Sequence, residues 1–256
     1  MQNVSIVLRS FLLISIAFLV SCGVNRPATE SSSIVQNIQV NDSGTGQAIN
    51  ISLEQGKSHN HPSFAIWAED MEENFIQTLF VTKAIGTGLF GHGSIDVEKW
   101  DNKPGFQKRP ASLPYWINKR IPADGGPQLP DPEHPVPDAY SGATPAGDSK
   151  IAAKLDNSMK GKIRILMEVN QPWDWNEYWT NTKFDDPEYR TSCQPSLVYA
   201  VTVDLDKPGN ELYLNPIGHG HYSGENGELF TDLSTLSTAK DIFSKITVKV
   251  KLNSNL

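Results

Sequence analysis

The segment Ser63-Phe64-Ala65-Ile66-Trp67-Ala68-Glu69 indicates the fold class, because it is short, apolar and of strand length. In an extended strand, alternate side chains point to opposite faces. Phe64, Ile66 and Ala68 therefore share one face, and Trp67 lies on the other. Either the sheet is covered on both faces at this point, or Trp67 packs against a separate element on the outer face.

Similar apolar segments recur along the chain between Gly, Pro and Asn residues, and no long 3.6-residue periodicity accompanies them. We expect further strands over Ala48–Glu54, Phe75–Val81, Lys162–Val169, Leu197–Asp204, Glu211–Leu214 and Ile246–Leu252. Seven short strands in about 200 residues predict an all-β fold, a fibronectin- or immunoglobulin-like sandwich of two sheets over residues 48–256.

A long irregular insertion, at about residues 86–160, separates the third expected strand from the fourth. It holds ten of the seventeen prolines. Connections of this length are usually functional or disordered. We expect the insertion to lie outside the two sheets.

The N-terminus has the features of an export signal. One cation, Arg9, precedes the apolar run Phe11–Val20, which is too short to span a bilayer. The run ends in Leu19-Val20-Ser21-Cys22, which resembles the lipobox of bacterial lipoproteins. We therefore expect residues 1–21 to be a signal peptide, with lipidation of Cys22 after cleavage. Residues 22–47, poor in apolar side chains, are expected to form a flexible tether.

Charge and cysteine content narrow the class of protein further. Removal of the signal peptide would take away Arg9 and shift the formal net charge from −7 to −8. An acidic surface argues against binding to nucleic acid or to anionic lipid, so the acyl anchor would be the membrane contact. The expected location is the bacterial cell envelope, facing the periplasm or the cell surface. Besides Cys22 there is only Cys193, so no intrachain disulfide framework is expected.

The most specific motif is Asp138-Ala139-Tyr140-Ser141-Gly142-Ala143-Thr144. It resembles the pattern Asp-x-x-Ser/Thr-Gly-Ala-Thr, at which extracytoplasmic redox proteins carry a covalent flavin. A threonine hydroxyl can form a phosphoester with FMN, and small neighbours leave it uncovered. The alternative is an ordinary polar turn, because Pro137, Gly142 and Pro145 mark a loop in either case.

Two resemblances follow from these residues. The segments Phe64–Asp70, Ile76–Leu79, Leu113–Trp116 and Asp138–Thr144 make most of residues 48–252 resemble the periplasmic proteins grouped as domain of unknown function 2271. That resemblance implies a fibronectin-like sandwich, an extracytoplasmic location and association with flavin-linked membrane redox proteins.

The motif alone is similar to FMN-binding domains modified by a flavin transferase. This similarity implies that Thr144 receives FMN, that the transferase recognises Asp138, and that Ser141, Gly142 and Ala143 complete the site. The chain departs from the pattern at Pro145-Ala146, where many targets carry a further Ser or Thr. Pro145 also restricts Thr144 to extended backbone angles.

Four of the six histidines form two His-x-His pairs, His59 with His61 and His219 with His221. In an extended chain each pair would offer two imidazoles to one zinc or copper ion. The alternative is solvated or backbone-bonded histidines in loops, since Pro or Gly adjoins both pairs.

Three indoles, Trp173, Trp175 and Trp179, lie within one polar segment. They would either form an exposed surface that stacks a flavin ring or a sugar, or close one end of the sandwich. Signatures of an independent catalyst are lacking. Cys193 has no histidine near it in sequence, and Ser141 is not in a nucleophile elbow.

Three hypotheses remain from the sequence: an electron-transfer lipoprotein that carries FMN and serves a membrane redox partner, a cofactor-free binding or scaffold lipoprotein, and a metal-binding lipoprotein.

Overall fold

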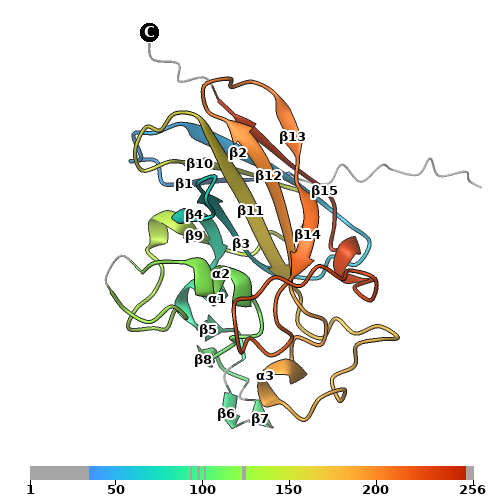
Figure 1. Cartoon of the computed structure of the whole chain (residues 1–256). Coiled ribbons are helices and arrows are strands. Elements are labelled where there is room, and N and C mark those ends of the chain that lie inside the picture. Colours follow the sequence, from blue (N-terminus) through green and yellow to red (C-terminus); the bar gives the residue numbers. More distant parts are fainter. Residues whose placement is uncertain (1–34, 93, 97–98, 101, 123–124, 252–256) are drawn as a thin grey trace, which may run out of the picture. The chain divides into compact units, whose positions relative to one another are not determined.

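A computed structural model describes residues 35–92, 94–96, 99–100, 102–122 and 125–251 (Figure 1). The expected signal peptide, Cys22 and the first half of the expected tether, residues 22–34, lie outside the described residues. Two mixed sheets pack face to face, so the prediction of an all-β two-sheet sandwich is confirmed. Within the described residues, no helix is both long enough and apolar enough to cross a membrane.

Each sheet of the sandwich combines strands from distant parts of the chain. The first sheet, called sheet A, has the order β1 (Gln36–Val40), β10 (Ser149–Lys154), β2 (Ala48–Gln55), β15 (Phe243–Val250) and β13 (Glu211–Tyr213). Sheet B has the order β14 (Asn215–His219), β12 (Leu197–Asp204), β11 (Lys162–Asn170), β3 (Ser63–Glu69), β4 (Phe75–Thr82) and β9 (Ser141–Gly142). All seven strands expected from the sequence occur, with ends that differ by up to three residues.

Shorter elements lie outside the two main sheets. They are the strand pairs β5 (Leu89–Phe90) with β8 (Gly105–Phe106) and β6 (Ser94–Asp96) with β7 (Lys99–Trp100), the helices α1 (Lys83–Thr87), α2 (Pro114–Lys119) and α3 (Pro187–Arg190), and the 3-10 turns η1 (Asp138–Tyr140) and η2 (Ala239–Asp241).

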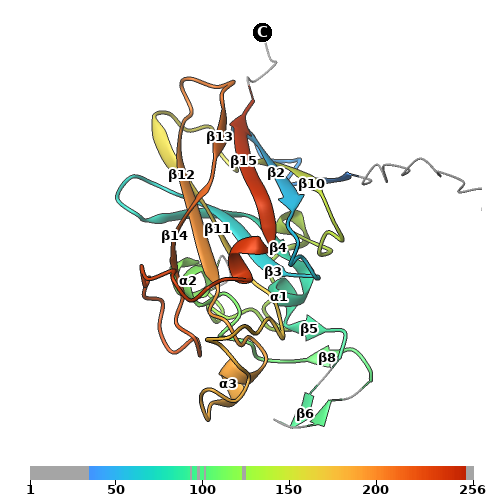
Figure 2. The ribbon, with the colours of Figure 1, turned by 90° about the vertical axis from the view of Figure 1, so that its right-hand side faces the viewer.

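Alternation of apolar and polar residues builds the core between the sheets. In β2, Ile49, Ile51 and Leu53 point inward and are fully or almost fully buried, while the intervening Asn50 and Ser52 point outward. Removal of such large apolar side chains from water is the main driving force for folding. The outward side chains leave the outer face of sheet A polar. In Figure 2, β2, β10 and β15 of sheet A lie on one side of the sandwich, and β12 and β14 of sheet B lie on the other.

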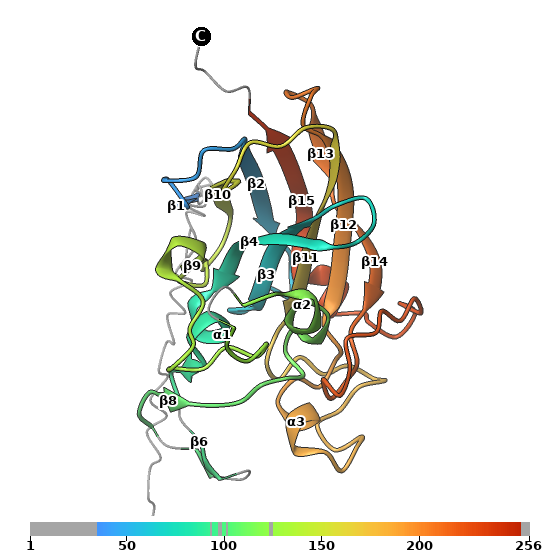
Figure 3. The ribbon, with the colours of Figure 1, turned by 60° about the vertical axis from the view of Figure 1, so that its left-hand side comes forward.

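The outer face of sheet B is covered by the insertion, so the sheet is buried on both faces here. Trp67 is fully buried and belongs to a second apolar cluster with Leu113 and Trp116, which come from the insertion. Helices α1 and α2 lie over this face (Figure 3). The strand Ser63–Glu69 is therefore buried at every position.

Two boundary predictions are wrong. The expected tether over residues 22–47 contains β1, which pairs with β10 in parallel. The expected insertion over residues 86–160 does not lie wholly outside the sheets, because β9 and β10 join them. Both strands of the β1–β10 pair have few large apolar residues, because each strand turns only one face toward the core; β1 is in addition the edge strand of sheet A. The sequence signal for them is correspondingly weak.

Candidate cofactor attachment site

The motif of residues 138–144 lies at the edge of sheet B, where the chain crosses to sheet A. Asp138–Tyr140 form η1, and Ser141–Gly142 form β9, which pairs in parallel with the end of β4. The chain then continues through residues 143–148 into β10 of sheet A (Figure 1). The motif is thus attached to both sheets rather than carried on a detached loop.

Side-chain hydrogen bonds fix the first half of the motif. The Tyr140 hydroxyl donates to Asp156 Oδ1 at 2.7 Å, and Asn41 Nδ2 donates to the same oxygen at 2.8 Å. Burial raises the pKa of Tyr140 to about 12, and the hydrogen bond to Asp156 acts in the same direction. The phenol therefore stays protonated as the donor at neutral pH. Asn41 N also donates to Ala139 O at 2.8 Å.

Gly142 is required by close packing. A Cβ atom at this position would lie 2.9 Å from Cε2 of Phe80, which is fully buried and cannot move aside easily. In this fold, glycine at this position allows β9 to approach β4 closely.

The second half of the motif, which ends at Thr144, is partly accessible to solvent. Asp138 and Ala143 are exposed, Thr144 is half-buried, and Pro145 behind it is buried. Within the described residues, no hydrogen bond reaches the Thr144 hydroxyl. Ser141 Oγ is buried and has no hydrogen-bond partner in the same residues. The Thr144 hydroxyl is therefore partly accessible to solvent and is not used in a structural hydrogen bond within the described residues.

The two histidine pairs are not brought together, because His59 and His61 lie in the loop between β2 and β3, whereas His219 ends β14 and His221 follows it. Leu197 of β12 is paired with His219 and with Val169, and Val169 is paired with Phe64, close to the His61 loop. Three strand spacings of about 4.8 Å therefore separate the two pairs along the sheet. Within the part of the chain that the structure describes, no group of three or more His, Cys, Asp or Glu side chains is placed to hold a metal ion.

In each pair, one histidine ring packs against a phenylalanine ring. His59 packs edge-on against Phe243 with 5.5 Å between ring centroids, and its pKa is lowered by burial and by His61. His219 stacks on Phe230 at 5.3 Å. The ring of His221 lies 4.5 Å from that of Tyr222 and 5.9 Å from that of Phe230 between centroids.

The tryptophans of the segment that contains Trp173, Trp175 and Trp179 differ in burial: one is packed in the core, and two are exposed. Trp179 packs against the main core, and its Nε1 donates to Thr235 Oγ1 at 2.9 Å. Trp173, Trp175 and Tyr178 are instead 43%, 55% and 48% exposed. Trp179 therefore packs at the end of the sandwich, whereas the exposed rings of Trp173 and Trp175 contact each other with 6.5 Å between centroids.

Backbone hydrogen bonds hold the segment that carries these exposed rings. Trp173 has a left-handed φ of 60°, an unfavourable conformation for a large side chain, and its N donates to Thr191 O at 2.8 Å. Asn176 Oδ1 accepts from Tyr178 N and Trp179 N. The exposed rings therefore sit on an ordered segment.

Glu168 is a buried group that the sequence reasoning missed. It is fully buried on the outer face of β11, and it accepts hydrogen bonds from Tyr115 N at 3.1 Å, Trp116 N at 2.6 Å and Ser196 Oγ at 2.5 Å. Burial raises the pKa of Glu168 to about 7. The carboxylate caps the first turn of α2 and so fixes the insertion on sheet B. Its only sequence signal is a charged residue within an apolar strand.

Cys193 is buried, and burial raises the pKa of its thiol to about 11. The thiol is therefore protonated at neutral pH, which agrees with a structural role.

No family model, curated protein or solved structure matches this chain. The resemblance to domain of unknown function 2271 and the flavin motif stay predictions from the sequence.

Proposed function

We propose that this protein is an extracytoplasmic, lipid-anchored electron carrier that holds FMN through a phosphoester on Thr144. The observation that supports this function best is the half-buried Thr144 hydroxyl, without a partner in the described residues, in a motif attached to both sheets. FMN bound there would supply reversible electron transfer with a membrane redox partner.

Each motif residue has a role that its surroundings permit. Exposed Asp138 is available for recognition by a flavin transferase, and Gly142 lets β9 approach β4. Formation of the bond joins Thr144 Oγ1 to the phosphorus of FMN. The phosphorus loses a P–O bond to a leaving oxygen, and that oxygen takes up the proton of the threonine hydroxyl. With FMN as the donor, the leaving group is water, so the adduct has the mass of FMN less one water, and no electrons are transferred.

The first prediction tests attachment directly. The exported wild-type protein, coexpressed with a flavin transferase, should gain the mass of FMN less one water and should absorb blue light. Intact-mass spectrometry and visible absorption measure these two properties, and expression without the transferase is the control. An unmodified, colourless protein in the presence of a transferase active on a known target would contradict the proposal.

The second prediction concerns the anchor, which rests on the lipobox-like sequence before Cys22. Cys22→Ser should release the protein into the aqueous fraction or leave its signal peptide uncleaved, because the acyl chains would be absent. Detergent partitioning and N-terminal mass measure the outcome. A wild-type protein that enters the aqueous phase without proteolysis would oppose this prediction.

A cofactor-free binding lipoprotein is the second candidate, favoured by the contacting exposed rings of Trp173 and Trp175 and by the exposed ring of Tyr178 on the same ordered segment. Large exposed aromatic groups often mark contact sites. This function would account for a protein that is anchored but not flavinylated. The separated histidine pairs give the third hypothesis, a metal-binding lipoprotein, no comparable support.

A further inference from the structure

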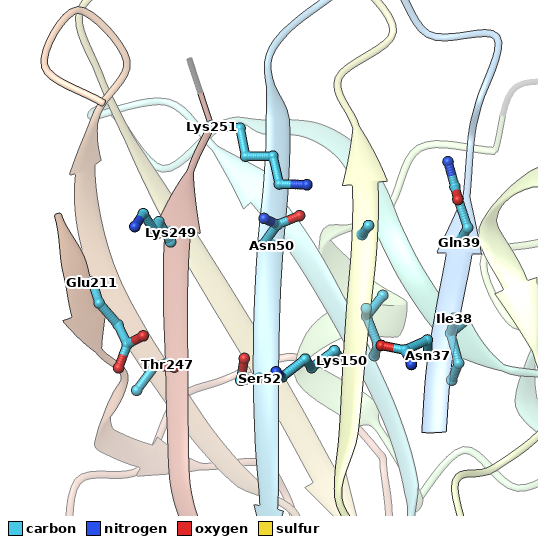
Figure 4. A pocket seen from close by; sticks show the side chains of 12 residues that line it. Asn37, Ile38, Gln39, Asn50, Ser52, Lys150, Glu211, Thr247, Lys249 and Lys251 are labelled. Atoms are coloured by element: carbon cyan, nitrogen blue, oxygen red, sulfur yellow. The ribbon is translucent and has the colours of Figure 1, made fainter. Parts of the chain in front are cut away.

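The outer face of sheet A contains a hollow of about 420 Å³ (Figure 4). All five strands of the sheet contribute to its lining. The side chains that face it are mainly amides, hydroxyls and ammonium groups. The hollow is therefore suited to a hydrophilic ligand rather than to an apolar one.

Strand register arranges these side chains in two rows across the sheet. The first row runs Tyr213, Thr247, Ser52, Lys150 and Asn37, and the second runs Glu211, Lys249, Asn50, Ala152 and Gln39. Members of neighbouring rows are two residues apart on each strand, so all of them face outward. Across five strands each row extends roughly 19 Å, which suits an extended ligand.

The lining is cationic although the protein is acidic. Lys150, Lys249 and Lys251 are exposed, and within the described residues no ion pair reaches them. In Figure 4, Lys251 reaches over β2 beside Asn50, and Lys150 reaches toward Ser52. Glu211 is the one acidic residue in the lining, and its Oε1 lies 4.0 Å from Lys245 Nζ. The hollow thus carries an excess of positive charge on a chain of net charge −7.

An aromatic ring ends the first row. Tyr213 is 57% exposed, on the same face as Thr247. Sugar rings have apolar faces that pack on aromatic side chains, and their hydroxyls pair with amides and hydroxyls.

We infer that the open face of sheet A binds an acidic oligosaccharide laid across its strands. The ammonium groups of Lys150, Lys249 and Lys251 pair with carboxylates on successive sugars. The side-chain amides of both rows and the Ser52 hydroxyl bind sugar hydroxyls, whereas Thr247 is buried and does not reach the ligand, and Tyr213 stacks on a terminal ring. This site is separate from Thr144 and does not depend on FMN.

The test uses a short oligogalacturonate and the same oligosaccharide with its carboxylates methyl-esterified. Isothermal titration of the wild-type protein should show binding of the acid that weakens as salt is added, and at least about tenfold weaker binding of the ester. Equal affinity for acid and ester would overturn the inference. Tighter binding of a DNA oligonucleotide than of the acid would overturn it as well.

Variants locate the site. The triple change Lys150→Gln, Lys249→Gln and Lys251→Gln should weaken binding of the acid by at least about tenfold, and Tyr213→Ala by about fivefold. Lys83→Gln, an exposed lysine on α1, is the matched control and should leave the affinity unchanged. Because these side chains are exposed, thermal unfolding should stay close to wild type. Unchanged binding by the folded triple variant would refute the site.

Discussion

Thr144→Val should abolish the flavin adduct completely. Valine nearly preserves the shape of threonine but has no hydroxyl, so the phosphoester has no oxygen through which to form. Thr144 is half-buried and its hydroxyl has no hydrogen bond within the described residues, so the loss of this hydroxyl should have little effect on stability. Intact mass after coexpression with a flavin transferase measures the adduct, and thermal unfolding checks the fold.

Two further variants sharpen this test. Thr144→Ser restores a hydroxyl and should recover part of the modification, which a purely structural role for Thr144 would not explain. Asp138→Ala should slow modification if the transferase recognises the exposed carboxylate. Persistence of the adduct in the valine variant would place FMN on another residue, and the proposed site would be wrong.

The strands predicted from the sequence are those whose local pattern and burial agree. In β2, Ile49, Ile51 and Leu53 alternate with polar residues, so the buried face is evident without a structure. In β1, only Ile38 and Val40 mark the inner face, and the strand pairs with β10 more than one hundred residues away. Such an edge strand depends on a partner that no local pattern identifies. The sequence alone therefore predicts a tether at these residues.

The candidate site likewise combines a feature that the local sequence predicts with contacts that depend on distant residues. The motif of residues 138–144 is visible in the sequence because its chemistry is local. Its attachment through Tyr140 and Asn41 to Asp156 is not, because Asn41 and Asp156 are 115 residues apart. Whether a tryptophan is exposed or buried likewise depends on tertiary packing. The sequence alone is therefore compatible with either an exposed or a core position for Trp173 and Trp179.

Glu168→Ala should destabilise the protein by about 3 kcal/mol near pH 5. The change leaves Tyr115 N and Trp116 N at the start of α2 without their buried acceptor, and it opens a cavity between α2 and sheet B. Glu168→Gln keeps a carbonyl acceptor of nearly the same size and should cost less. Chemical denaturation measures both changes, and Glu133→Ala, at an exposed position, is the control. A loss no larger than that of the control would show that Glu168 does not hold the insertion on the sheet.

The same carboxyl group should make stability depend on pH. Its pKa is about 7 in the folded protein and 4.5 in the reference state, so both states are protonated below pH 4.5. Between these values the unfolded chain ionises first, unfolding releases a proton, and stability falls as pH rises. The contribution, on the order of 3 kcal/mol, should be lost by about pH 7. Glu168→Gln cannot titrate, so it should remove this part of the slope, and its stability relative to wild type should improve from pH 5 to pH 8. An identical slope in both proteins would assign the pH dependence to other groups and would show that the buried carboxyl is ionised throughout this range.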